Sequence, residues 1–96
     1  MLRHAVLFRW RPEVTAEDVA AITEALRQLP AVIPELRDYQ VGSDVGTDDG
    51  NWDFAVVAVF DNEAARQAYV RHPEHQAVAL RIRAFAAARA AVQFES

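Results

Sequence analysis

The segment Trp52–Phe60 constrains the fold most, because its apolar residues fall on both sides of an extended chain. Alternate residues of a strand point to opposite faces of a sheet. Five apolar side chains share one face, namely Trp52, Phe54, Val56, Ala58 and Phe60. Three share the other face, namely Ala55, Val57 and Val59. An antiparallel sheet with one face in water alternates apolar and polar residues instead, so this segment predicts a strand that is covered on both faces.

The rest of the chain alternates between strand and helix patterns. Before Pro12, the chain is typical of a strand whose two faces carry His4, Val6, Phe8 and Trp10 on one side and Ala5, Leu7 and Arg9 on the other. After Thr15, apolar residues recur every three or four positions, and Thr15 is placed to cap this helix together with Asp18. Gly42 indicates a bulge or a bend in the second strand, and Asp61 is placed to cap the next helix. The predicted elements are strands over 3–10, 36–45, 52–60 and 88–94, and helices over 15–29, 61–71 and 73–84.

This β-α-β-β-α-β order predicts a ferredoxin-like fold of the α+β class, with a four-stranded antiparallel sheet and helices on one face. The helices of one chain cover only that face. The other face, which carries Ala55, Val57 and Val59, therefore needs a partner. A second copy packed sheet to sheet is the simplest one, and it predicts a two-fold homodimer. The alternative is a monomer that exposes these small apolar side chains.

Composition narrows the classes of function. With 96 residues and 52% apolar content, the chain is expected to fold as one domain over 1–96. No apolar run approaches the roughly 20 residues of a membrane span, and Arg9 interrupts the first apolar stretch, so we expect neither a membrane protein nor a signal peptide. The lack of cysteine excludes thiol catalysis and thiolate metal sites. All ten basic residues are scattered arginines, a pattern that does not favour nucleic-acid binding. A cytoplasmic location is expected.

The stretch Tyr69-Val70-Arg71-His72-Pro73-Glu74-His75 gathers two of the three histidines, a tyrosine and a proline. No other part of the chain is so rich in groups that transfer protons. Proline disfavours helix at the residue before it and suits the first turn of a new helix. The helix is therefore expected to break at His72 and to start again at Pro73.

His75 is expected to point inward from the first turn of the new helix. It shares a helical stripe with three core-type residues, Val78, Ile82 and Phe85. The positive end of the helix dipole favours the neutral imidazole, which suits a general base or a hydrogen-bond acceptor near neutral pH. Tyr69 ends the previous helix on its inner side, so its hydroxyl is expected to meet His75. His4, on the first strand, joins them in one cavity if its side of that strand faces the helices.

A structural role accounts for the same residues without any chemistry. In that interpretation His75 is a core histidine with a satisfied hydrogen bond, and Tyr69 is its partner. A metal site is not expected, because His72 and His75 are poorly spaced across a proline break and only Glu74 supplies a nearby carboxylate.

These residues together resemble the stress-responsive A/B barrel family. The resemblance covers nearly the whole chain and rests on His4, Gly42, the segment from Trp52-Asp53 to Phe60 and, above all, the Tyr-x-x-His-Pro-x-His string at 69–75. It implies two ferredoxin-like protomers whose sheets close a dimeric α/β barrel. The family includes plant stress-induced proteins and the polyketide cyclase that makes olivetolic acid.

The resemblance to that cyclase implies an intramolecular aldol condensation that uses no metal or cofactor. His75 would be the base that removes a proton next to a carbonyl, Tyr69 would steady it, and His4 would lie in the pocket. The substrate does not carry over. Leu26 stands where the cyclase has a pocket tyrosine, and Glu74 stands where it has an alanine.

Three hypotheses for the function stay open. The first is a dimeric barrel that binds a small, largely apolar molecule without turnover. The second is a cofactor-free cyclase or isomerase of carbonyl compounds, with His75 as base and Tyr69 as orienter. The third is a structural or interaction domain without a ligand. A cavity above about 300 Å³ favours the first two, and its expected lining beside the Tyr69–His75 pair is His4, Val6, Phe8, Leu26 and His72.

Overall fold

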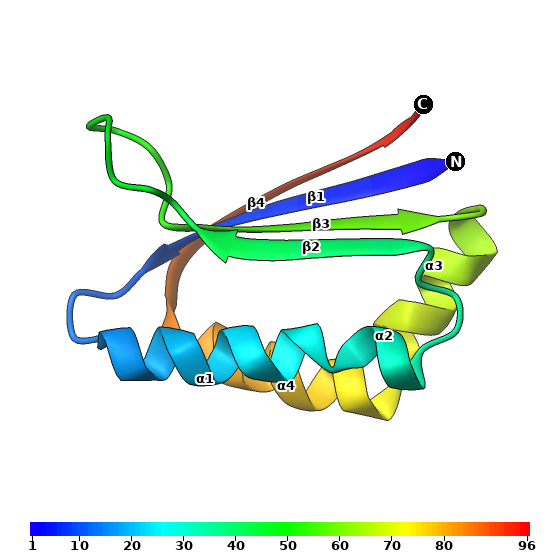
Figure 1. The fold of residues 1–96 in the computed structure, drawn as a ribbon, viewed down its shortest axis with the longest axis horizontal. Coiled ribbons are helices and arrows are strands. Elements are labelled where there is room, and N and C mark those ends of the chain that lie inside the picture. Colours follow the sequence, from blue (N-terminus) through cyan, green and yellow to red (C-terminus); the bar gives the residue numbers. More distant parts are fainter.

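The computed structural model describes residues 1–96 as an antiparallel sheet that lies over a layer of helices (Figure 1). All four helices lie on the same side of the sheet, and α1 and α4 run along its length. The elements in order are β1 (Leu2–Trp10), α1 (Ala16–Arg27), α2 (Leu29–Val32), β2 (Asp38–Ser43), β3 (Phe54–Phe60), α3 (Glu63–Arg71), α4 (Pro73–Phe85) and β4 (Ala86–Glu95).

The strands follow the order β2-β3-β1-β4, and every neighbouring pair is antiparallel. β1 and β3 are the central strands, as the predicted ferredoxin-like fold requires. The register of β1 and β3 places His4 opposite Ala58 and Val6 opposite Val56. These residues face the helices, so the inner side of β1 forms the floor beneath α3 and α4.

The core lies between the inner face of the sheet and the helices. The predicted stripe of α1 is confirmed, since Ile22 and Leu26 are buried and Leu29 follows them at the start of α2. Burying a large aliphatic or aromatic side chain stabilises a fold by about 1.5–3 kcal/mol, so this stripe fixes α1 to the sheet. The side chains most completely buried are Phe54, Phe60, Ile22, Leu26 and Ile33.

No helix covers the outer face of the sheet (Figure 1). The pairing of β1 with β3 and β4 places Ala5, Leu7, Ala55, Val57, Val59, Ala90, Val92 and Phe94 on this side. Leu7, Val92 and Phe94 are exposed, although all three are large and apolar. Exposed apolar patches of this kind mark interaction sites, so the outer face carries the apolar character that the sequence predicts for it.

Three local predictions are wrong in detail. Asn62, rather than Asp61, caps α3, because its side chain accepts from the N–H of Ala65 while the Asp61 carboxylate pairs with Arg37. Gly42 makes no bulge, since the β2–β3 register runs through it without a shift. The irregularity occurs where β1 meets β4, near the end of β1. The first helix also ends earlier than expected, and a separate short helix with a proline in its first turn follows it.

None of the helices is both long enough and apolar enough to span a lipid bilayer.

Candidate functional site

The joint between α3 and α4 orients the side chains of the candidate site. His72 ends one helix and begins the other with an extended backbone, φ −64° and ψ 131°, and Pro73 occupies the first position of α4. The predicted break at His72 is therefore confirmed. Nδ1 of His72 accepts a hydrogen bond from the N–H of Glu74 at 3.1 Å and so caps α4. This imidazole is thus used within the helix joint.

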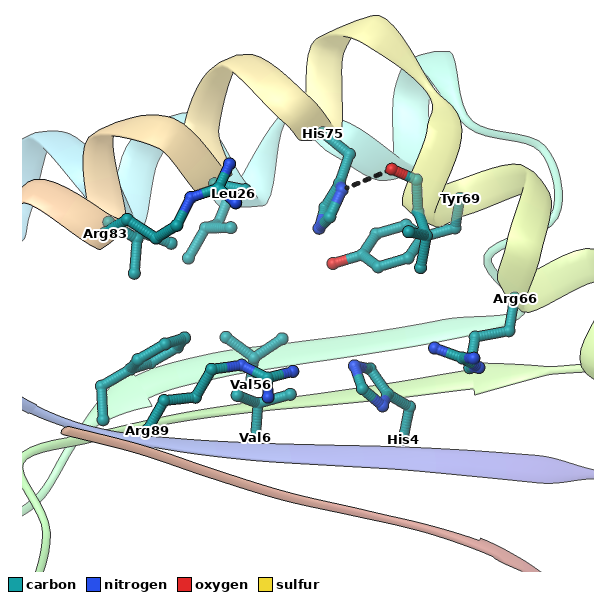
Figure 2. Close-up of a pocket in the computed structure, with 13 residues that line it drawn as sticks. His4, Val6, Leu26, Val56, Arg66, Tyr69, His75, Arg83 and Arg89 are labelled. Carbon is teal, nitrogen blue, oxygen red and sulfur yellow. Dashed lines mark hydrogen bonds between the residues drawn. The ribbon is translucent and has the colours of Figure 1, made fainter. Parts of the chain in front are cut away.

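His75 points from the first turn of α4 toward the sheet (Figure 2). Its Nδ1–H donates to the carbonyl of Val70 at 3.3 Å, which leaves the lone pair of Nε2 free in the neutral ring. Burial lowers the pKa of His75 below its usual 6.5, and the Val70 hydrogen bond only partly opposes this effect. Repulsion from His4 and Arg83 lowers this pKa further. The ring is therefore held as a neutral imidazole with a free basic nitrogen.

Tyr69 contacts His75 with its ring and not with its hydroxyl. The two ring centroids are 4.1 Å apart and the planes are inclined by 45°. The hydroxyl of Tyr69 instead forms a 3.0 Å hydrogen bond with the hydroxyl of Tyr39, on the inner side of β2. The expected meeting of the Tyr69 hydroxyl with His75 is therefore wrong. Burial raises the pKa values of both tyrosines, so both stay protonated at neutral pH.

His4 rises toward the same space from β1, on the opposite side of the cavity from His75 (Figure 2). It is only 6% exposed, and its Nδ1 is 2.7 Å from Oε1 of Gln93, which is its cross-strand neighbour on β4. Burial lowers the pKa of His4, Arg66 and Arg89 lower it further, and the Gln93 hydrogen bond raises it. His4 is thus a second imidazole that favours the neutral form.

The Nε2 atoms of His4 and His75 both border open space. Neither atom forms a hydrogen bond, because each histidine uses only Nδ1. Every buried side-chain nitrogen or oxygen of the molecule has a partner. Each unpartnered Nε2 therefore keeps some accessible surface, and both imidazoles belong to residues that line the cavity.

The cavity between α4 and the sheet has a volume of about 340 Å³. This volume falls within the usual range of roughly 300–1,000 Å³ for small-molecule sites. Six of the residues expected at the site line it, and His72 does not. The full lining comprises His4, Val6, Phe8, Leu26, Val56, Arg66, Tyr69, Val70, His75, Ala79, Ile82, Arg83 and Arg89.

Sequence reasoning missed the polar partners of the site. The alternation of β2 could have placed Tyr39 on the inner face of the sheet. The pairing of β4 with β1 could have placed Gln93 beside His4. Arg66, Arg83 and Arg89 also line the cavity. They come from three different elements, and their spacing along the chain does not bring them together.

No group of three or more His, Cys, Asp or Glu side chains is arranged to hold a metal ion. The cavity instead combines apolar walls with two basic imidazole nitrogens. Such a site can bind an organic molecule of moderate size and accept a proton from it.

Comparisons with known proteins agree with this architecture. The family model described as the stress responsive A/B barrel domain matches residues 2–96. An uncharacterized protein of Streptomyces coelicolor is 34% identical over 79 residues, which cover 80% of this chain and 81% of that protein.

Two solved structures are similar over nearly the whole chain. A dimeric ferredoxin-like protein of unknown function from Thermobifida fusca is 47% identical, with a TM-score of 0.93 and coverage of 99% of this chain and 90% of that one. A dimeric protein of unknown function with the same fold from Bacteroides fragilis is 32% identical, with a TM-score of 0.84 and coverage of 99% and 95%.

Proposed function

The chain belongs to the stress responsive A/B barrel domain family, and on that premise we propose that it is a homodimeric protein that binds a small, largely apolar molecule between α4 and the sheet. The cavity of about 340 Å³ is the observation that carries this proposal. Its walls are mainly aliphatic and aromatic, with residues such as Val6, Phe8 and Leu26. A purely structural role accounts for the Nδ1 hydrogen bonds of His4 and His75, but it does not account for the two Nε2 atoms that form no hydrogen bond.

The dimer rests on the outer face of the sheet. Val57 and Val59 lie there beside the exposed side chains Leu7, Val92 and Phe94. The Thermobifida fusca and Bacteroides fragilis relatives are dimeric. A two-fold pairing of outer faces buries these side chains without using the cavity, which lies on the opposite, helix-covered face of the sheet. Sedimentation should give a dimer at micromolar concentration, and a monomer there contradicts the proposal.

A neutral aromatic amide, 3-phenylpropanamide, tests binding without any assumption about the natural ligand. Titration should shift the imidazole NMR signals of His4 and His75. Ala79 lines the cavity, so Ala79→Phe should fill it and abolish the shifts. Ala84, on the same helix, is exposed and does not line the cavity, so Ala84→Phe is the matched control and should retain them. If neither histidine responds to the amide or to the matching acid, 3-phenylpropanoate, in the unmodified protein, the proposed binding function is wrong.

A second candidate function, base catalysis on a carbonyl compound, is favoured by the free Nε2 of His75. In this reaction Nε2 takes a proton from the carbon next to a carbonyl, and the C–H electron pair moves into an enolate. Tyr69 acts as the orienting residue: if Tyr39 donates the hydrogen bond between the two hydroxyls, the Tyr69 proton is free to donate to the carbonyl oxygen. The enolate then attacks a second carbonyl or is reprotonated by His75 at a different position.

Hydrogen exchange in a simple ketone measures this step directly. We expect the protein to speed deuterium uptake from D₂O into 4-phenylbutan-2-one next to its carbonyl, followed by NMR. His75→Gln keeps a polar side chain of similar size and should reduce the rate to that of buffer. If the unmodified protein gives only the buffer rate while the amide still binds, the catalytic role is contradicted and the binding role stands.

A further inference from the structure

Arg83 and Arg89 are exposed residues, and the guanidinium group of neither forms an ion pair or a hydrogen bond within the protein. Arg83 comes from the last turn of α4 and Arg89 from β4, and both line the cavity. Figure 2 shows Arg83 on the helix side of the cavity and Arg89 on the sheet side, where it extends toward His4. The three ion pairs of the molecule use other groups. The hydrogen bonds donated by arginines come from Arg3, Arg9, Arg11, Arg37 and Arg66.

Arg66 differs from these two although it also lines the cavity. Its guanidinium forms several hydrogen bonds with the Glu63 carboxylate, the shortest at 2.6 Å. These bonds lower the pKa of Glu63 to about 2, so this carboxylate is ionised and offsets the charge of Arg66. The unpaired positive charge of the cavity lining therefore belongs to Arg83 and Arg89.

The lining contains no acidic residue at all. The chain as a whole carries a formal net charge of −4, with 14 acidic and 10 basic residues. The protein is acidic, but its cavity is lined by three arginines and no carboxylate. The charge of the lining is therefore opposite in sign to that of the whole chain. A surplus of cationic donors beside an apolar space is what an amphipathic anion requires.

We propose that the ligand of this cavity is an apolar carboxylic acid whose carboxylate binds Arg83 and Arg89. This inference rests on the proposed binding function and names the class of its ligand. Guanidinium groups present donors in a planar fork that matches the two oxygens of a carboxylate. The apolar body then lies along Val6 and Leu26, where it replaces water.

The carboxylate also fixes the orientation of the ligand. With its charged end held by Arg83 and Arg89, the rest of the molecule occupies the space that His4 and His75 face from opposite sides (Figure 2). The anion offsets the repulsion that Arg83 exerts on the His75 imidazolium and Arg89 on that of His4. Binding of the acid should therefore raise the pKa of both histidines, whereas a neutral ligand of the same shape leaves this repulsion in place.

A matched pair of probes tests the inference. Titration of 3-phenylpropanoate and of its neutral amide, followed by the imidazole NMR signals of His4 and His75, compares one apolar body with and without a charge. We expect the carboxylate to bind about tenfold more tightly at low salt, a ratio typical of one charge-assisted contact. Arg83→Gln and Arg89→Gln should each bring the affinity for the acid toward that for the amide. Arg81→Gln removes the same charge from α4 at an exposed position outside the cavity and should keep the preference.

The outcomes separate the two proposals. If acid and amide bind equally to the unmodified protein, the carboxylate inference is overturned and the binding function stands. The same conclusion follows if Arg81→Gln reduces the preference as much as Arg83→Gln does, since the effect is then one of overall charge. If neither compound shifts the signals of His4 and His75, both the cavity as a binding site and the inference built on it are wrong.

Discussion

The imidazole of His75 lies against the ring of Tyr69, with the ring centroids 4.1 Å apart. This contact covers one side of the imidazole with an apolar surface, and burial is the main reason why the pKa of His75 falls. The Tyr69 ring is itself held by Phe60, at 5.2 Å between centroids, and by the hydroxyl of Tyr39. The position of the candidate base thus depends on a buried network that extends from α4 through α3 to β2.

The Tyr39–Tyr69 hydrogen bond is expected to couple these two residues energetically. Tyr39→Phe and Tyr69→Phe should each destabilise the protein by about 1 kcal/mol, because each leaves a buried hydroxyl without its partner. The double variant should cost less than the sum of the two single variants, since no orphaned hydroxyl remains. Urea unfolding of the four proteins measures the coupling. Strictly additive costs would show that the two hydroxyls do not depend on each other.

The fold could be predicted from local patterns, because those patterns are set by burial. Val19, Ile22 and Leu26 are spaced by three and four residues because they share the side of the helix that packs on the core. The doubly apolar Trp52–Phe60 segment gives a central strand for the same reason. Pro73 places the helix joint through backbone sterics alone. Each of these patterns depends on residues that are close in the sequence, so each can be recognised without knowing the contacts between distant segments.

The polar part of the site depends on contacts between distant segments and could be predicted only in part. Nothing near Tyr69 in the sequence indicates that its hydroxyl bonds to a residue 30 positions earlier. Asp61 and Asn62 are both good caps, and the distant Arg37 decides between them by pairing with Asp61. Arginine side chains are long and flexible, so their position in the sequence does not show which of them turn toward the cavity.

The two histidines of the cavity should make stability depend on pH. Their pKa values are lowered from 6.5 in the folded protein, so the unfolded chain binds more protons between the folded value and about 6.5. The free energy of unfolding should therefore rise with pH through this window, by at most about 1.4 kcal/mol per pH unit for each histidine, and should be lost as the pH falls below about 6.5. The pKa values of Asp61 and Glu63 are lowered from their usual 3.8 and 4.5, so these two carboxylates affect the free energy of unfolding only at lower pH.

Replacing both histidines tests this assignment. In the double variant His4→Gln, His75→Gln, the free energy of unfolding should change little with pH between about pH 5 and 7. Denaturant unfolding at fixed protein concentration is the measurement, since the stability of a dimer depends on concentration. An unchanged slope in the double variant would assign the pH dependence to other groups.

A charge on the outer face of the sheet should separate the protomers. Val57→Asp places a carboxylate in the proposed contact, where it has no partner, and burying an unpaired charge is strongly unfavourable. Sedimentation should then give a monomer while far-UV circular dichroism stays unchanged. Leu7→Arg, at a more exposed position on the same face, serves as a second variant if Val57→Asp fails to fold. Val45→Asp, on the hairpin loop at 85% exposure, is the control and should remain dimeric. Dimers in both outer-face variants would place the contact elsewhere.

The helix joint provides a test of whether His72 acts as a cap or as part of the site. Its imidazole accepts from the N–H of Glu74 and does not line the cavity. His72→Ala should cost about 1 kcal/mol, the usual loss when a helix loses its N-cap, and His72→Asn should recover most of it because asparagine is a preferred cap. The affinity for 3-phenylpropanamide should be the same in His72→Asn as in the unmodified protein. Chemical denaturation gives the first pair of values and NMR titration the second. A loss of affinity in His72→Asn without a loss of stability would place His72 among the ligand contacts, and unchanged stability in His72→Ala would contradict its assignment as a cap.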